Sequence, residues 1–132
     1  MSGMTFDDFI PDCPKRAQII KDAHPRVHII RIEAIQLRIN ERVDDNNNET
    51  LNDDYKRGLI RRLKYVYEDF VDPTVTIPGR YKSSQIQMLS HKTLKMGFII
   101  HSANNTLELK AAIPIAAECL DILKRVDKGE SK

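Results

Sequence analysis

Two apolar seams run along the stretch from Val27 to Val43, VHIIRIEAIQLRINERV. The first seam recurs at spacings of three and four residues and comprises Ile32, Ile35, Ile39 and Val43. The second follows the same spacing on the roughly opposite side and comprises Val27, Ile30, Ala34 and Leu37. A surface helix of a small globular protein needs only one apolar stripe. Two stripes predict a helix that is buried on two sides, within a bundle or between subunits.

The same periodicity predicts the other helices. Pro14 suits the first position of a short helix over about 15–23, and Pro25 suits the start of the two-seamed helix, which runs to about Asp44. Further helices are expected from about Thr50 to Val71, over 83–102, and from about 105 to 126 with a bend at Pro114. Polar or proline-containing segments separate them, as expected for antiparallel neighbours.

Three helix starts carry capping patterns. Thr50 is followed three residues later by Asp53, and Asn105 is followed at the same spacing by Glu108. Ser83 or Ser84 is expected to cap the helix over 83–102.

A competing interpretation is an α+β fold. The segment 27–39 is rich in β-branched residues and alternates in polarity, with a phase slip at Ala34-Ile35 that a bulge could absorb. A hairpin near 98–110, turning at Asn104-Asn105, would accompany that strand. The helical interpretation is preferred because both seams are continuous and because residues such as Glu33, Gln36 and Leu37 favour helix.

The sequence therefore predicts an all-α fold, a bundle of about four main helices with a short N-terminal helix. The 132 residues suffice for one domain with a substantial core. We assign 1–13 to an irregular lead-in with one short turn after Thr5, 14–127 to a single helical domain and 128–132 to a flexible tail.

Composition narrows the classes of function. Hydrophobic residues make up 41% of the chain and charged residues 30%, and tryptophan is absent. The core is therefore expected to consist of aliphatic seams. The scarcity of aromatic residues also argues against a protein that stacks single-stranded nucleic acid on aromatic rings. No apolar run approaches the ~20 residues that cross a bilayer. Asp7, Asp8 and Asp12 stand where a secretory signal needs positive charge. We expect a soluble, intracellular protein without a membrane partner and with two reduced cysteines.

Basic residues are segregated along the chain. The segment Lys56–Lys64 contains five bases and no acid, and no acid occurs between Asp72 and Glu108. Gly79–Ser84 also places bases and hydroxyls before a helix N-terminus, where anions bind readily. The candidate residues for binding an anion or a nucleic-acid backbone are Arg57, Arg61, Arg62, Lys64, Arg80, Lys82, Lys92 and Lys95. The alternative is that these basic side chains are simply solvated on the exposed faces of their helices and bind nothing.

No motif specifies catalysis, a metal site or a cofactor. Cys119 lies on a predicted apolar face, and Cys13 has an acidic neighbour that disfavours a thiolate. His24 and His28 are four residues apart, but Pro25 stands between them and no third ligand is suggested. An enzyme would need a pocket that gathers Glu68, Asp72 or His91.

The sequence favours a non-enzymatic interaction or assembly protein that acts through apolar helix seams and self-associates. The apolar seams outnumber those that a four-helix monomer must hide, so either the second helix is central in the bundle or one of its seams meets a protein partner or a second copy. Ile32, Ile35 and Ile39 are the predicted contact residues. The alternative function is a nucleic-acid-associated coat or accessory protein whose basic helix face binds phosphates.

Overall fold

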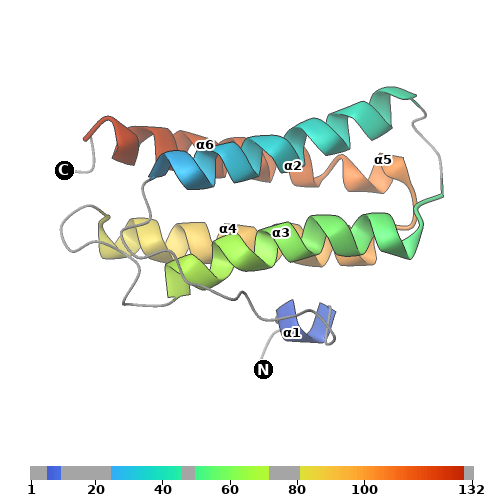
Figure 1. Ribbon diagram of the computed structural model, residues 1–132, viewed down its shortest axis with the longest axis horizontal. Coiled ribbons are helices and arrows are strands. Elements are labelled where there is room, and N and C mark those ends of the chain that lie inside the picture. The colour runs from blue at the N-terminus through green and yellow to red at the C-terminus, as the bar shows by residue number, and fades with distance from the viewer. Residues whose placement is uncertain (1–5, 10–24, 46–49, 72–80, 130–132) are drawn as a thin grey trace.

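The computed structural model describes residues 6–9, 25–45, 50–71 and 81–129. Its helices are α1 (Phe6–Phe9), α2 (Pro25–Asp45), α3 (Asp53–Val71), α4 (Ser83–Ser102), α5 (Thr106–Leu109) and α6 (Ala112–Asp127). The four long helices form two layers, with α2 beside α6 in one layer and α3 beside α4 in the other (Figure 1). The predicted all-α bundle is confirmed.

The competing α+β interpretation is wrong. The segment 27–39 lies within α2, and 98–110 comprises the end of α4, a turn and α5. The described residues contain one isolated β-bridge, between Thr50 and Asn105, and no strand. β-Branched residues are tolerated in α2 because packing of an amphipathic face outweighs their weak preference for strands.

The core is aliphatic and continuous through the bundle. Ile32, Ile35 and Ile39 of α2 are completely buried in it. The apolar seams of the other helices supply the rest of the core, including Leu59 and Leu63 of α3. The other core residues with no exposed surface are Leu89, Met96, Ile100, Leu109, Ala112, Ala116, Cys119 and Leu123.

Polar contacts join α3 to α4 at the end of the bundle where α3 begins and α4 ends. The Lys56 ammonium of α3 donates hydrogen bonds to the carbonyls of His101 and Ala103, at 3.0 and 2.8 Å. These carbonyls belong to the C-terminal end of α4, where helical acceptors lack partners within the helix. The Leu51 amide also donates to the Asn104 carbonyl at 3.2 Å. The antiparallel pairing of α3 and α4 is therefore closed by charge-assisted hydrogen bonds.

The helix ends partly match the predictions. Asn105 caps α5, its side chain accepting from the Glu108 amide at 2.9 Å, as predicted. The start of α3 differs from the prediction. The Asn52 side chain, and not that of Thr50, accepts a hydrogen bond from the Tyr55 amide in the first turn, at 2.8 Å. At α4 the Gln85 side chain accepts from the Lys82 amide at 2.8 Å, so neither Ser83 nor Ser84 is the capping residue.

The last predicted helix is two helices and not one bent helix. A turn at Lys110-Ala111 separates α5 from α6. Pro114 then falls in the first turn of α6, where amides need no helical acceptor, so the proline is accommodated without a kink. The short helix expected over 15–23 and the tail at 130–132 lie outside the described residues.

The short turn predicted after Thr5 is present as the helical turn α1 at Phe6–Phe9. This single helical turn packs across α3 and α4, and its two phenylalanines are 2% and 6% exposed (Figure 1). Gly97 of α4 makes room for it, since a Cβ there would stand 2.7 Å from Phe6 Cε1 and 3.2 Å from Phe9 Cε2. The absence of a side chain at Gly97 is thus a requirement of this packing.

Substituting the two helix-interior glycines tests that requirement. Gly58→Ala meets no atom within 4 Å and should stabilise the fold by up to about 1 kcal/mol through helix propensity. Gly97→Ala should be less stable than Gly58→Ala by about 1–2 kcal/mol in urea denaturation, because the new methyl group overlaps Phe6.

A double-mutant cycle distinguishes the clash from a general effect on α4. In a Phe6→Ala background, Gly97→Ala should cost less stability than in the natural chain, although Phe9 Cε2 still stands 3.2 Å from the new Cβ. A Gly97→Ala effect that is the same with and without the Phe6 ring would contradict the packing described here.

Candidate interaction surfaces

The predicted contact seam on α2 faces inward. Ile32, Ile35 and Ile39 have no exposed surface, so the prediction that they meet a partner is wrong for the folded chain. The second seam faces outward, with Ile30 66% and Leu37 60% exposed and Ala34 partly exposed between them. The pattern of a single helix reveals two seams but does not reveal which one the other helices cover.

Polar pairs border this outer face of α2, defined here as Ile30, Ala34 and Leu37. Glu33 lies 3.6 Å from the Lys124 ammonium of α6, and Arg26 lies 3.4 Å from the Asp127 carboxylate. Both pairs bridge α2 to α6 along one side of the stripe. An apolar strip with a charged border has the composition of a protein–protein contact, in which apolar centres are surrounded by polar rims.

The eight predicted basic residues do not form one face. Arg57 and Arg61 are exposed on α3, but Lys64 is only 4% exposed and cannot reach a phosphate backbone, which corrects its assignment. Lys92 of α4 pairs with Glu118 of α6, and the pKa of Glu118 is lowered by this hydrogen bond and by the charge of Lys92. Lys82, the N-cap residue before α4, and Lys95 of α4 are exposed, and Arg80 lies outside the described residues.

A smaller basic cluster forms between α2 and α3. Arg38, which sequence analysis missed, and Arg62 line a 190 Å³ hollow together with Tyr55, Gly58, Leu59 and Asp54. Burial and the nearby positive charges of Arg38 and Arg61 lower the pKa of Arg62. Among the described residues, no carboxylate forms an ion pair with Arg38, Arg61 or Arg62. We call these three residues the arginine cluster.

Tyr55 fixes the geometry at the edge of the arginine cluster. Its hydroxyl donates a hydrogen bond to the Arg38 carbonyl at 3.1 Å, and the Arg42 guanidinium lies 4.4 Å from its ring centroid. Burial raises the pKa of the Tyr55 hydroxyl above its ordinary value. The spacing of Arg31, Arg38 and Arg42 along one side of α2 was the signal in the sequence that could have revealed this side as basic.

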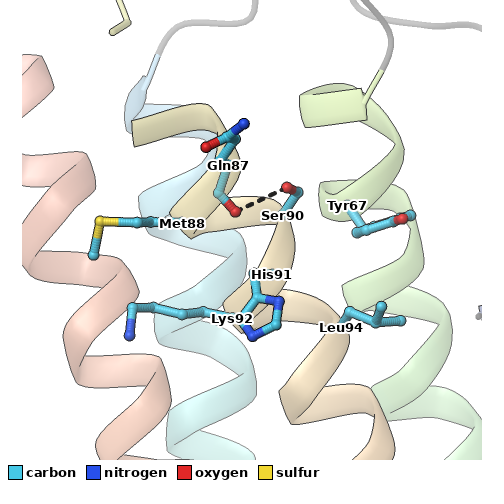
Figure 2. A pocket seen from close by; sticks show the side chains of 7 residues that line it. All are labelled: Tyr67, Gln87, Met88, Ser90, His91, Lys92 and Leu94. Atoms are coloured by element: carbon cyan, nitrogen blue, oxygen red, sulfur yellow. Dashed lines mark hydrogen bonds between the residues drawn. The ribbon is translucent and has the colours of Figure 1, made fainter. Parts of the chain in front are cut away.

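A hollow of about 560 Å³ lies along α4 (Figure 2). It is lined by Tyr67, Gln87, Met88, Ser90, His91, Lys92 and Leu94. Ser90 donates its hydroxyl hydrogen bond to the Gln87 carbonyl at 3.1 Å. Figure 2 shows Met88 and Lys92 on one side of α4 and Tyr67 and Leu94 on the other. Of the three residues named for an enzyme pocket, His91 is in this lining and Glu68 is not, while Asp72 lies outside the described residues.

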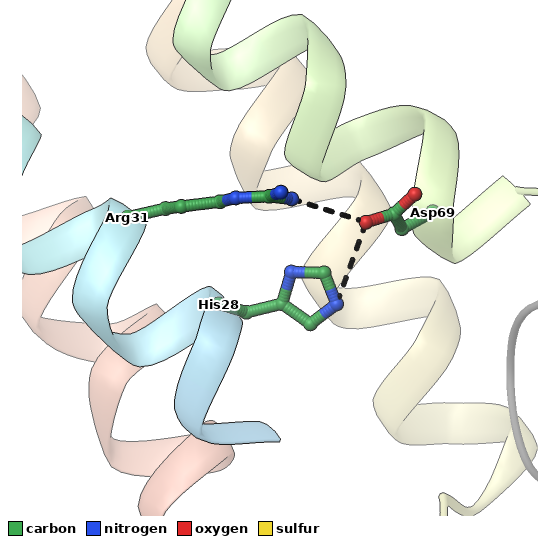
Figure 3. A network of polar contacts seen from close by, with 3 residues as sticks. All are labelled: His28, Arg31 and Asp69. Carbon is green, nitrogen blue, oxygen red and sulfur yellow. Dashed lines mark hydrogen bonds and ion pairs between the residues drawn. The ribbon is translucent and has the colours of Figure 1, made fainter. Parts of the chain in front are cut away.

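A buried polar network connects α2 and α3 near the start of α2 (Figure 3). Asp69 has no exposed side-chain surface; its Oδ2 accepts from the Arg31 guanidinium at 3.2 Å and lies 3.8 Å from His28 Nε2. The His28 ring also packs on Phe70, with centroids 4.7 Å apart. Asp69 and His28 are both sealed from solvent, whereas the Arg31 side chain is 28% exposed, and the network joins α2 to α3.

Other chemistry finds little support among the described residues. Burial raises the pKa of the Cys119 thiol to about 12, which leaves almost no thiolate at neutral pH. No group of three or more metal-binding side chains gathers in the described part of the chain. Within the same residues, every helix is too short or too polar to span a bilayer.

Removing Asp69 tests the buried network. Asp69→Ala should lower the free energy of unfolding by about 3 kcal/mol, because His28 and Arg31 lose the carboxylate they surround. Asp121→Ala is the matched control: this exposed carboxylate pairs with Arg125 at 3.0 Å, and its loss should cost under about 0.5 kcal/mol. Equal effects in urea denaturation would show that Asp69 does not stabilise the bundle.

No family model matches the chain, and neither a curated protein nor a solved structure matches it.

Proposed function

We propose that the protein is a non-enzymatic interaction or assembly protein and that the outer face of α2 contacts a second copy of the chain. The observation that carries this proposal is the exposure of Ile30 and Leu37, 66% and 60%, on the same side of one helix. They are seven residues apart, which is about two helical turns. Contiguous exposed aliphatic side chains on a helix are typical of contact surfaces.

The arrangement of this face supports a copy of the same chain as the partner. Ile30 precedes Ala34 by four residues and Leu37 follows it by three, so a small residue stands between two large ones almost symmetrically. Two antiparallel copies related by a two-fold axis near Ala34 would place Ile30 of each against Leu37 of the other. A small central residue lets two helices approach closely, and the large side chains then fill the space on either side.

A charge on the outer face should disrupt the assembly. Leu37→Glu should weaken self-association at least about tenfold, since a carboxylate would have to be buried against an aliphatic side chain. Sedimentation equilibrium of the full chain measures the change. Stability of the monomer should stay within about 0.5 kcal/mol because the position is exposed.

Met88→Glu is the control for that experiment. Met88 is 47% exposed but lies on α4, in the other layer. It should leave the association constant unchanged. If Met88→Glu dissociates the protein and Leu37→Glu does not, the contact lies elsewhere and the proposal fails.

A second candidate function is binding of a nucleic-acid backbone by the arginine cluster. The supporting observations are that Arg38 and Arg62 line one hollow, that the charges of Arg38 and Arg61 lower the pKa of Arg62, and that no carboxylate among the described residues forms an ion pair with any of the three. Arginine forks suit bidentate contact with phosphate, and a phosphate would relieve the mutual repulsion of the three guanidinium groups.

Charge reversal tests this second function. Arg38→Glu combined with Arg62→Glu should weaken binding of a fluorescein-labelled DNA duplex at least about tenfold at low salt and reduce the slope of log affinity against log salt by about 2. Lys95→Glu, an exposed lysine on α4, is the control. An equal loss with Lys95→Glu would mean that general charge and not the arginine cluster attracts DNA.

A further inference from the structure

Two residues of opposite charge stand at the two ends of the outer face of α2. Arg26 lies four residues before Ile30, and Glu41 lies four residues after Leu37. Both charged side chains are exposed. At 3.6 residues per turn, these four residues and Ala34 fall within about a quarter of the helix circumference. The outer face of α2 therefore continues into a base at its N-terminal end and into an acid at its C-terminal end.

The spacing of these residues is symmetrical, whereas their charge is not. Four exposed residues, separated by four, seven and four positions, form what we call the α2 stripe: Arg26, Ile30, Leu37 and Glu41. Reading the stripe backwards exchanges Ile30 with Leu37, which are both large and aliphatic. The same reversal exchanges Arg26 with Glu41, which carry opposite charges. A surface with this pattern is complementary to a reversed copy of itself.

Two of the neighbouring charges are paired within the chain. Glu33, beside the midpoint of the stripe, lies 3.6 Å from the Lys124 ammonium of α6. Arg26 contacts the Asp127 carboxylate of α6 through Nε at 3.4 Å, and its side chain still remains 75% exposed. The guanidinium group has five N–H donors, so contact through Nε leaves room for a second carboxylate.

Glu41 differs from Glu33 because it forms no ion pair with any described residue. The two neighbouring arginines of α2 are directed toward α3: Arg38 lines the hollow between the two helices, and the Arg42 guanidinium lies over the Tyr55 ring. A second copy of the chain can therefore supply Glu41 with a charged partner that the described part of its own chain does not.

We propose that a second copy docks antiparallel on the α2 stripe and forms a closed dimer, in which Arg26 of each chain pairs with Glu41 of the other. This inference rests on the function proposed for the outer face of α2. It adds the orientation of the two chains, the residues that select this orientation, and a limit of two chains per assembly. The limit follows because a two-fold contact occupies the stripe of both chains, so the expected mass is twice 15.2 kDa.

The end charges exclude the other way of pairing the same two faces. A parallel arrangement would place Arg26 against Arg26 and Glu41 against Glu41. Like charges that face each other across an interface oppose association. The antiparallel arrangement gives two attractive contacts instead, because the two-fold axis repeats each of them.

The end charges select the orientation more than they strengthen the contact. Each exposed ion pair contributes little, and most of the affinity comes from burial of the aliphatic side chains between the two ends. Salt screens exposed charges. The dimer should therefore persist at high salt, while the effect of altering the end charges should become small.

Reversal of each end charge tests the orientation in the full chain. Arg26→Glu and Glu41→Arg each replace two attractive contacts of the antiparallel dimer by two repulsive ones. Sedimentation equilibrium at low salt should show that either change alone weakens self-association about tenfold. The double variant restores opposite charges at both contacts and should return to within about twofold of the natural chain.

Lys95→Glu on α4 is the matched control, because it alters the net charge by the same amount as Arg26→Glu and should leave association unchanged. Circular dichroism melts establish that each variant is folded. If Arg26→Glu unfolds the chain beside Asp127, Arg26→Gln and Glu41→Gln replace the reversals. Their two losses should not add, because either change removes both ion pairs.

The possible results separate the orientation from the face itself. If Leu37→Glu dissociates the protein but neither reversal weakens association, the outer face is the contact and the antiparallel pairing is wrong. A double reversal that stays as weak as the single ones, or two neutral changes whose losses add, would also overturn the pairing of Arg26 with Glu41. A chain that is monomeric, or whose association survives Leu37→Glu, would reject the outer face and this inference together.

Discussion

Complete burial of one side of α2 is the constraint on which the rest of the structure depends. Ile32, Ile35 and Ile39 are withdrawn from water together, and a helix is too rigid to turn one of them outward without the others. Once this side faces the core, the opposite side with Ile30 and Leu37 must face solvent. The rotation of a single helix thus decides both what holds the bundle together and which surface is free to contact another molecule.

Polar contacts refine the arrangement that aliphatic packing selects. At one end Asp69 of α3 holds Arg31 and lies near His28 of α2, and at the other end the Lys56 ammonium closes α3 against the carbonyls of α4. Neither contact presents a reactive group to solvent. Burial also makes Cys119 unreactive. It raises the pKa of the thiol to about 12, so the thiolate that would act as a nucleophile is almost absent at neutral pH.

Sequence periodicity predicted most of the fold because every long helix repeats its apolar residues at helical spacing. The bounds of α4 agree with the prediction, and the cap of α5 at Asn105 was recognised from its partner three residues later. Periodicity could not select which side of α2 faces inward, since both sides are apolar and only the neighbouring helices distinguish them. Placing Ile32, Ile35 and Ile39 on a partner surface was the consequence.

The candidate sites were harder to predict because they combine residues that are distant along the chain. The arginine cluster joins Arg38 of α2 to Arg61 and Arg62 of α3, whereas the eight bases predicted from the sequence, from Arg57 to Lys95, did not include Arg38. The packing of α1 likewise depends on Gly97, about 90 residues after Phe6 in the sequence. A lone glycine in a helix has no signature that reveals which ring lies against it.

The most direct test of the central claim is the mass of the full chain in solution, measured by light scattering on a sizing column at low and high salt with absorbance at 260 and 280 nm. Contact through the outer face of α2 predicts a multiple of 15.2 kDa that is unchanged by salt, with the spectrum of protein alone. A monomer at all concentrations would contradict it. A multimer that high salt dissociates, releasing material that absorbs at 260 nm, would instead assign the association to bound nucleic acid.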